Sequence, residues 1–543
     1  MNSDDRLSSP AKTGTRRFPL PDLLSPTAYP HAVTNLHLRE TNLSWVILTG
    51  PFAYKIKKAV HFDFIDTTNL ARRNELCREE LRLNRRLAAD LYVDVVAITR
   101  DAAGLRIAGQ GAVVEYAVRM RQFDASQELS ALLARGEAQI TEMAGLAESL
   151  ARFHAAAALP PPSQEFQRTN QLNFAVLAAL AALRTHAAGA ADPAELERLT
   201  DWTRAYLQAG LERLHLREQS ACIRECHGDL HAGNIVRWRG ALTPFDCLEF
   251  DPKLRYIDVL NDVAFLVMDL VSHRRDDLAA CFLNRYLECT GDYSGVPLLP
   301  LYAVYRALVR AMVDALGIES DPPRREYFQE HLRMRMSTAR DFTLRPRPLL
   351  VLMHGPSGSG KSWLSERLIG PLAAIRIRSD IERKRLGLAL QATPLEARKQ
   401  SGDAPGLYEL PLTNRTYAHM LECAQQCLEG GFNTIIDASF LSVTSRLGFL
   451  DLAASRGIDC VILACHADYA ILAGRIEQRR RLYDDPSDAD LGVLQGQLHN
   501  QEPLRLAERA HCIDVDTAVP AALPAALAAI QAYRGAHIRI AGA

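Results

Sequence analysis

The chain lacks the cysteine spacing of a structural zinc site. Its 543 residues include eleven cysteines, but no two of them form a C-x-x-C pair. Cys222 and Cys226 lie near His227 and His231, and these four side chains could hold zinc. The second ligand pair of a structural site is missing, however, and the histidines belong to a motif with a different chemistry. We therefore expect free thiols in a reducing compartment.

The chain also lacks an excess of charge of either sign. Its formal net charge is −1, with 23% charged and 48% hydrophobic residues, which is ordinary for a globular protein. A balanced charge gives no bulk attraction to nucleic acid or to a membrane surface. We expect neither as a partner, and the sequence leaves the oligomeric state open.

Long apolar runs are missing as well. The first twenty residues contain no apolar core of signal-peptide length. The longest helical apolar run, residues 174–183, is too short to span a bilayer. The sequence therefore predicts a cytoplasmic protein with no membrane segment.

The length predicts two to four domains, and no internal repeat is visible. Residues 1–30 are polar and contain several prolines, so we expect a loosely ordered lead-in. Residues 31–342 form a first domain, and the proline-containing residues 343–348 a linker. Residues 349–543 alternate apolar strands such as "LLVLM", "NTIIDASF" and "DCVILAC" with helices, which is typical of an α/β domain with a parallel sheet.

The first domain is strand-rich at its start and helical afterwards. The runs "SWVILTG" and "FAYKIKKAV" flank a Gly50-Pro51 turn and predict a hairpin. A charged helix follows in "ARRNELCREELRLNRRLAADL", then the strands "YVDVVAITRD" and "GAVVEYAVRM". Residues 125–340 are alanine-rich and helical, apart from residues 222–250. This order predicts an α+β domain with a small strand-rich lobe and a helical lobe.

The second domain opens with a phosphate-binding loop between an apolar strand and a helix. In such a loop the backbone N–H groups and the helix N-terminus cradle the phosphates of a nucleotide. Lys361 would reach the β- and γ-phosphates, and the Ser362 hydroxyl would hold Mg²⁺. We predict ATP and Mg²⁺ binding by the eight residues of "GPSGSGKS": Gly355, Pro356, Ser357, Gly358, Ser359, Gly360, Lys361 and Ser362.

Further polar groups follow this loop. In "IRIRSDIERKRL", Asp380 and Arg383 alone would be a helix cap and a solvated basic face. Together with the loop they resemble small-molecule and polynucleotide kinases of the P-loop class. That resemblance implies that Asp380 activates the acceptor hydroxyl and that Arg383 holds the acceptor. Asp437, at the end of "TIID", could be a second, Walker B-like carboxylate.

An arginine-rich segment, "GRIEQRRRL", precedes "DDPSDAD". It is either a solvated helix face or a lid whose arginines close on the transferring phosphate. On the second interpretation Arg475 and Arg479, with Arg480 and Arg481 beside them, contact ATP. Residues 347–543 as a whole resemble kinase-type, AAA-like P-loop domains.

The stretch "HGDLHAGN" carries a second phosphate-transfer motif. Protein kinases use H-R-D-x-x-x-x-N, in which the Asp takes up the acceptor hydroxyl and the Asn holds Mg²⁺. Asp229 and Asn234 keep this spacing, while Gly228 replaces the arginine. Asp246 follows twelve residues after Asn234, in "PFDCLEFD". One carboxylate and one amide oxygen are the hard ligands that Mg²⁺ prefers.

The segments "CHGDLHAGNIV", "PFDCLEF" and "YIDVLNDVAFLVMDL" resemble the aminoglycoside phosphotransferase and choline-kinase-like family. The resemblance implies a protein-kinase-like fold, with Asp229 as catalytic base and with Asn234 and Asp246 on Mg²⁺. Asp258 and Asp262 would be structural residues of the helical lobe or, alternatively, an ordinary helix N-terminus.

The family also pairs a strand lysine with a helix glutamate to position the ATP phosphates. Lys55 and Lys57 alternate onto one strand face, and the pattern "AYKI" favours Lys55. Glu80 is the preferred partner and Glu79 the reserve. No G-x-G-x-x-G precedes this strand, so a loop over the phosphates must be built from Thr41, Asn42 and Ser44 or be absent.

These motifs predict an ATP-dependent phosphotransferase with two nucleotide sites and small-molecule hydroxyl acceptors. Two alternatives stay open. One domain could be a nucleotide sensor or pseudokinase that regulates the other, or the chain could be a P-loop ATPase acting on nucleic acid.

Overall fold

The computed structural model describes residues 18–541 except 42, 63–64, 103, 163–167, 188, 345–346, 393–409 and 483–489. The chain forms two compact units. The smaller consists of Met1–Asp124 and Phe245–Asp251, and the larger of Ala125–Pro244 and Pro252–Ala543. The segment Phe245–Asp251, which contains the predicted metal ligand Asp246, therefore belongs with the strand-rich part.

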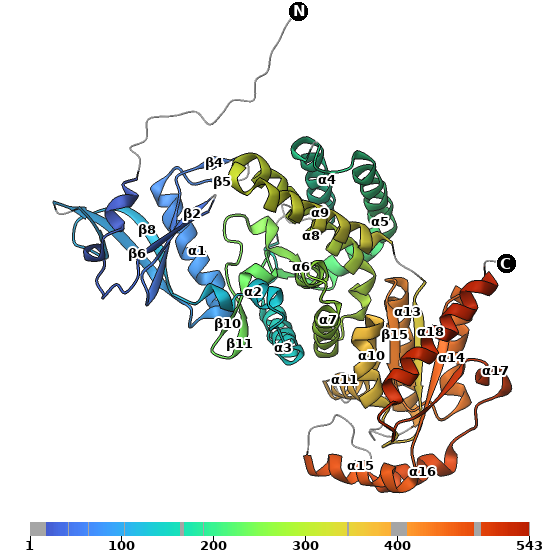
Figure 1. The fold of residues 1–543 in the computed structure, drawn as a ribbon. Coiled ribbons are helices and arrows are strands. Elements are labelled where there is room, and N and C mark those ends of the chain that lie inside the picture. The colour runs from blue at the N-terminus through green and yellow to red at the C-terminus, as the bar shows by residue number, and fades with distance from the viewer. Residues whose placement is uncertain are drawn as a thin grey trace, which may run out of the picture. The chain divides into compact units, whose positions relative to one another are not determined.

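The smaller unit is built on an antiparallel sheet of six strands in the order β1-β2-β3-β8-β6-β7. Figure 1 shows this sheet in blue, with helix α1 (Leu70–Ala88) beside it. Its strands are β1 (His37–Glu40), β2 (Ser44–Leu48), β3 (Phe52–Lys57), β6 (Tyr92–Asp101), β7 (Gly104–Ile107) and β8 (Ala112–Arg121), with β4 (His61–Phe62) and β5 (Ile65–Asp66) forming a separate pair. Helix α1 packs against β6 and β8. The predicted hairpin, helix and strands are all confirmed.

The start of the described chain differs from the expected lead-in. Residues 20–28 form two short 3-10 helices, Leu20–Leu23 and Pro26–Ala28. The side chain of Leu23 is fully buried, and the Tyr29 hydroxyl donates to the Leu23 carbonyl at 2.8 Å. Burial of these few apolar groups orders a segment whose prolines and polar residues predict little structure.

The larger unit begins with the predicted helical part. Its helices are α2 (Leu129–Ala134), α3 (Ile140–Ala156), α4 (Arg168–His186), α5 (Pro193–Gln219), α6 (Val259–Ser272), α7 (Asp276–Thr290), α8 (Leu299–Ser320) and α9 (Arg325–Thr343). Between α5 and α6 lie two small antiparallel pairs, β9 (Ile223–Glu225) with β12 (Tyr256–Asp258) and β10 (Ile235–Trp238) with β11 (Ala241–Pro244). The "HGDLHAGN" motif connects β9 to β10 as a loop that ends in a 3-10 turn, Ala232–Asn234.

One segment of the described chain, Tyr293–Ser320, is long and apolar enough by composition to cross a membrane. Of its most apolar window, 78% is buried inside the protein. It contains α8, which packs in the core shared by the helical part. In the sequence, Arg306, Arg310 and Asp314 interrupt this run, so it does not stand out as the longest apolar stretch.

The larger unit also contains the predicted parallel sheet, with five strands in the order β14-β15-β13-β16-β17. The strands are β13 (Leu349–His354), β14 (Ala374–Arg378), β15 (Asn433–Asp437), β16 (Asp459–His466) and β17 (Cys512–Asp516). The described helices around them are α10 (Lys361–Leu372), α11 (Ser379–Ala392), α13 (Leu410–Glu429), α14 (Val443–Arg456), α15 (Tyr469–Leu482), α16 (Leu491–Asn500), α17 (Leu506–Arg509) and α18 (Ala522–Ala541).

The first strand of this sheet, β13, is also its centre. Its residues Leu349, Val351 and Met353 pack with α10 and α18, while Leu350 and Leu352 between them are fully buried too. Both faces are therefore covered, as a continuous apolar run predicts. The chain leaves β13 toward β14 and β15 on one side and later reaches β16 and β17 on the other. The carboxyl end of β13 is thus a switch point, where ligands bind in open α/β sheets.

Candidate active sites

Two lysines of β3 share one carboxylate of α1. Lys55 and Lys57 lie on the same strand face, and Glu80 is fully buried. The Nζ of Lys55 lies 2.9 Å from Glu80 Oε1, and the Nζ of Lys57 lies 2.7 Å from Oε2. The reserve partner Glu79 instead pairs with Arg82 on its own helix. Glu80 is therefore the glutamate that faces the lysine strand.

The segment after the motif adds two further carboxylates. Lys55 Nζ donates to Asp246 Oδ1 at 2.5 Å, and Lys57 Nζ donates to Glu249. Lys55 thus joins Glu80 to the predicted metal ligand Asp246, which favours Lys55 as the phosphate-positioning lysine. Glu249 was not predicted as a site residue, because the glutamate in "CLEF" stands at no spacing that is typical of a motif.

These contacts keep the groups charged. Burial opposes ionisation of Glu80, but Lys55 and Lys57 outweigh it and hold its pKa at about 2. Burial likewise opposes the charge on Lys55, yet Asp246 and Glu80 raise its pKa above the ordinary value. Asp246 itself has a φ of 62°, and strain of this kind is kept where the direction of a side chain matters.

The turn between β1 and β2 contains the residues proposed to replace a glycine loop. The N–H of Thr41 donates to the carbonyl of Ser44 at 2.9 Å, and the N–H of Ser44 donates to the Thr41 hydroxyl at 3.0 Å. Asn42 lies outside the described residues. The turn is therefore closed by its own hydroxyl group, and its role over the phosphates stays a prediction.

The larger unit holds the predicted catalytic base. Asn234 Nδ2 donates to Asp229 Oδ2 at 2.9 Å, which leaves the amide oxygen of Asn234 as the donor for Mg²⁺. His231 Nε2 lies 3.5 Å from Asp229 Oδ2, and Arg310 Nη1 lies 3.2 Å from the same ring nitrogen. Burial would raise the pKa of Asp229, but His231 and Arg310 hold it well below its usual range. Asp229 is therefore a carboxylate at neutral pH.

Asp262 of α6 holds the backbone of this loop. Its two oxygens accept the N–H groups of His227 and Gly228, each at 2.9 Å, and His154 Nε2 lies 3.2 Å away. These bonds give Asp262 the structural role that the family resemblance implies. Asp258 is instead the N-cap residue of α6, the alternative left open by the sequence.

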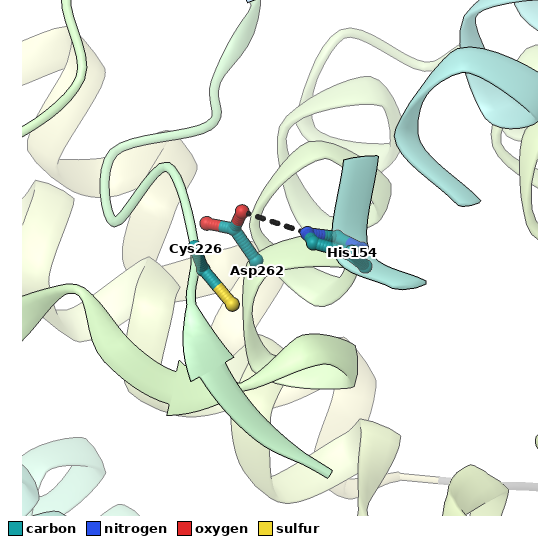
Figure 2. Close-up of side chains that lie close together, drawn as sticks. All are labelled: His154, Cys226 and Asp262. Carbon is teal, nitrogen blue, oxygen red and sulfur yellow. Dashed lines mark hydrogen bonds and ion pairs between the residues drawn. The ribbon is translucent and has the colours of Figure 1, made fainter. Parts of the chain in front are cut away.

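Figure 2 shows His154, Cys226 and Asp262, the one group in the described chain with metal-ligand side chains close together. His154 Nδ1 lies 2.9 Å from the Tyr286 hydroxyl, and Cys226 Sγ donates to the Ile257 carbonyl. Each candidate ligand already has a hydrogen-bond partner, so the group is a network that orients the loop. The four possible zinc ligands named from the sequence do not form such a group within the described part of the chain; they are Cys222, Cys226, His227 and His231.

The phosphate loop follows β13 at the switch point. Gly355 has a φ of 139°, and a Cβ there would lie 2.3 Å from the Cys465 carbonyl oxygen, so only glycine fits. Helix α10 begins at Lys361, which directs its N-terminus at the loop. Lys361 Nζ donates to the Pro356 carbonyl at 2.7 Å and to Ser359 Oγ at 3.3 Å. Burial lowers the pKa of Lys361, against the opposing charge of Asp437.

A carboxylate stands beside the predicted metal ligand Ser362. Asp437, at the end of β15, accepts a hydrogen bond from Ser362 Oγ at 3.3 Å and from Ser365 Oγ at 2.9 Å. The Walker B-like interpretation of Asp437 therefore gains geometric support. Ser365 was missed, and its only sequence signal is its place one helical turn after Ser362.

Asp380 lies in the first turn of α11, where Arg383 Nη1 is 3.6 Å from Asp380 Oδ1. The charge of Asp380 raises the pKa of Lys361 and the charge of Arg479 lowers it. Burial is nevertheless the main cause of the lowered pKa of Lys361, and the predicted roles of Asp380 and Arg479 stay predictions.

Arg475 of α15 braces the phosphate loop. It donates to the Gly358 carbonyl at 3.2 Å and to the Thr517 carbonyl at 2.8 Å. Arg475 is therefore not on a solvated helix face. Its contacts in the structure are to protein groups, and its predicted contact with ATP stays a prediction. Arg481 is exposed, and residues 483–489, which follow the predicted lid, lie outside the described residues.

Comparisons with known proteins cover both parts of the chain. A family model described as "AAA domain" matches residues 350–504. A gluconokinase from Sinorhizobium meliloti 1021 matches 36% of this chain and 99% of its own at 21% identity, with a TM-score of 0.26. A choline/ethanolamine kinase family protein from Mesorhizobium loti matches 57% of this chain and 89% of its own at 15% identity, with a TM-score of 0.35.

One sequence relative extends over both domains. The uncharacterized protein Rv2004c of Mycobacterium tuberculosis (strain ATCC 25618 / H37Rv) is 30% identical over 463 residues, which are 83% of this chain and 88% of the relative. The family model confirms the predicted AAA-type P-loop domain at residues 350–504. Phosphotransferase activity stays a prediction for both domains. The chain belongs to the family of the mycobacterial protein Rv2004c.

Proposed function

We propose that the chain is a magnesium-dependent phosphotransferase with two ATP sites, each of which transfers the γ-phosphoryl group to a hydroxyl of a small molecule. The observation that carries this proposal is the contact of Lys55 with both Glu80 and Asp246. It joins the phosphate-positioning ion pair to the metal carboxylate, the two features that an active kinase needs together. The group formed by Ser362 and Asp437 supports the second site.

At the first site the chain acts mainly by positioning. Lys55, held by Glu80, would meet phosphate oxygens, and Asp229 would orient the acceptor hydroxyl and accept its proton. By the motif, the Asn234 amide oxygen and the Asp246 carboxylate would each serve Mg²⁺, which prefers such hard oxygen ligands. Bound Mg²⁺ would neutralise the charge on the phosphates.

At the second site the donor set also fits Mg²⁺, because Ser362 and Asp437 offer adjacent oxygens. Lys361 would leave its contacts with the loop carbonyl to meet the β- and γ-phosphates. Asp380 would accept the proton of a second acceptor, which Arg383 would hold. Arg479 would add positive charge as the phosphoryl group moves.

Purified full-length protein with Mg²⁺, labelled ATP and a library of hydroxyl metabolites tests the proposal. The full chain is used because the helical part and the P-loop sheet pack as one unit. Asp229→Ala and Lys361→Ala should each remove a different phosphorylated product. If Asp229→Ala leaves all turnover intact and Lys361→Ala abolishes it, the kinase-like domain is a sensor and the two-enzyme proposal is wrong.

An ATPase acting on nucleic acid is less well supported, because the chain is close to neutral. Binding to a labelled oligonucleotide that weakens steeply with salt would favour that alternative over small-molecule transfer.

We also propose a cytoplasmic location. All eleven cysteines are free thiols, as a reducing compartment allows. Fractionation of cells that express the chain with a small epitope tag tests this, and recovery in the membrane fraction would contradict it.

A further inference from the structure

Helix α7 of the kinase-like domain covers the edge of the P-loop sheet. Asn284 Nδ2 donates to the Ala374 carbonyl at 2.7 Å, and the Arg376 N–H donates to Asn284 Oδ1 at 2.6 Å. The side-chain amide thus takes the place of a neighbouring strand along β14. An edge strand of a sheet needs such a partner when it is not exposed to water.

A buried ion pair lies one helical turn further along α7. Glu288 Oε1 lies 2.9 Å from Arg376 Nη2, and both side chains are at most 7% exposed. Arg385 Nη2 donates to the backbone carbonyl of Glu288 at 2.6 Å, which anchors this end of α7. A buried guanidinium needs its carboxylate, since an unpaired buried charge is strongly unfavourable.

Hydrogen bonds connect Arg376 to the residues of the phosphate site that are predicted to bind Mg²⁺. Arg376 Nη1 donates to Ser365 Oγ at 3.4 Å, and Ser365 Oγ donates to Asp437 Oδ2 at 2.9 Å. The other oxygen of Asp437 accepts from Ser362, the predicted Mg²⁺ ligand. Within the described chain Arg376 Nε has no hydrogen-bond partner, so Glu288 and Ser365 set the direction of the guanidinium.

We propose that Glu288, from the kinase-like domain, is a positioning residue for the Mg²⁺ side of the P-loop site. By neutralising Arg376 it keeps a buried cation from competing with Mg²⁺ for Asp437, and it holds Ser365 in place. Groups that orient metal ligands in this way typically change metal affinity by about 10–100-fold. The inference rests on the proposed function, in which this site binds MgATP.

The test is a titration of full-length protein with a fluorescent ATP analogue at increasing Mg²⁺. The signal of the matching Lys361→Ala protein is subtracted to isolate the P-loop site. Glu288→Gln should raise the Mg²⁺ midpoint about tenfold or more, while affinity for the metal-free nucleotide stays near that of the wild type. Adding Arg376→Met to Glu288→Gln removes the guanidinium that has lost its carboxylate partner, and this should bring the Mg²⁺ midpoint most of the way back to that of the wild type.

Asp277→Asn is the matched control. Asp277 also lies on α7 and pairs with an arginine, Arg275, but it is partly exposed and its pairing lies outside the chain of contacts to Asp437. It should leave the Mg²⁺ midpoint unchanged. Where Glu288→Gln does not fold, Glu288→Asp, which draws the carboxylate back from Arg376, should give a smaller shift in the same direction.

Two results overturn the inference. One is an unchanged Mg²⁺ midpoint in a folded Glu288 variant. The other is an equal loss of affinity for metal-free and Mg²⁺-bound nucleotide, because that would indicate general damage to the domain. If Lys361→Ala binds MgATP as well as the wild type does, the P-loop is not the MgATP site and the proposed function itself is wrong. This result is separate from the two results that overturn the role of Glu288.

Discussion

Gly228 donates its backbone N–H to Asp262 Oδ1 at 2.9 Å, and this bond sets the conformation of the loop that contains Asp229. Gly228 has a φ of 84°, a left-handed value that costs other residues about 1–2 kcal/mol. The arginine that protein kinases carry at this position would have to adopt the same backbone. The glycine of the motif is therefore required by the backbone geometry that Asp262 imposes.

Gly228→Ala should weaken the kinase-like site. The Cβ disfavours the left-handed conformation, so the loop should shift away from Asp262 and displace Asp229, which lies next along the chain. We expect a lower rate of Asp229-dependent phosphoryl transfer and a loss of unfolding free energy of about 1–2 kcal/mol. Steady-state kinetics and thermal unfolding measure the two effects.

Gly145→Ala is the control for that substitution. Gly145 lies inside α3 with open space where a Cβ would be, so alanine should be neutral or slightly stabilising. A Gly228→Ala protein with unchanged kinetics and stability would contradict the requirement for glycine.

Lys55→Met and Lys57→Met should separate catalysis from stability. Lys55 contacts Asp246, a predicted metal ligand, so its loss should sharply lower the rate of transfer at the kinase-like site and raise the KM for ATP. Lys57 is only 5% exposed at its side chain and neutralises Glu249, so its loss should chiefly lower stability, by roughly 3–5 kcal/mol for a broken buried pair. Comparing KM with melting temperature for each variant is the measurement.

The opposite pattern would assign phosphate positioning to Lys57. Arg82→Met serves as the control, because its pair with Glu79 lies on the helix surface and contributes little.

Much of the fold was predictable, because strands and helices follow local patterns. The alternation in β3 placed Lys55 and Lys57 together, and the glycines of the phosphate loop marked the turn after β13. The contact with Asp246 distinguishes Lys55 from Lys57, and Asp246 lies 191 residues further along the chain than Lys55. No local pattern encodes such a contact.

The contacts between the domains were not predictable for the same reason. Asn284 and Glu288 look like ordinary helix residues in the sequence, and Arg376 looks like a strand residue with a surface charge. Only the packing of α7 on β14 buries them together. The burial of Tyr29 near the chain start likewise depends on a sheet that forms later in the sequence.

Chelators should leave the stability of the nucleotide-free protein unchanged. The group formed by His154, Cys226 and Asp262 is saturated by hydrogen bonds, so it offers no site whose emptying would cost folding energy. Thermal unfolding with and without a strong zinc chelator measures this. A lowered melting temperature together with about one zinc per chain by elemental analysis, the stoichiometry of a single structural site, would show that the group is a metal site.

Asp314 should make stability depend on pH. Burial is the main cause that raises its pKa to about 6, despite Arg310 and Arg335, and Asp269 adds to the rise. The unfolded chain releases this proton near pH 3.9, so the folded state binds the proton more tightly. Its stabilising effect is complete below about pH 4 and disappears as the pH rises through about 6. Relative to Asp314→Asn, wild-type protein should therefore lose on the order of 2 kcal/mol of unfolding free energy across this window. Urea unfolding of both proteins at several pH values measures it, and parallel pH profiles would contradict the raised pKa.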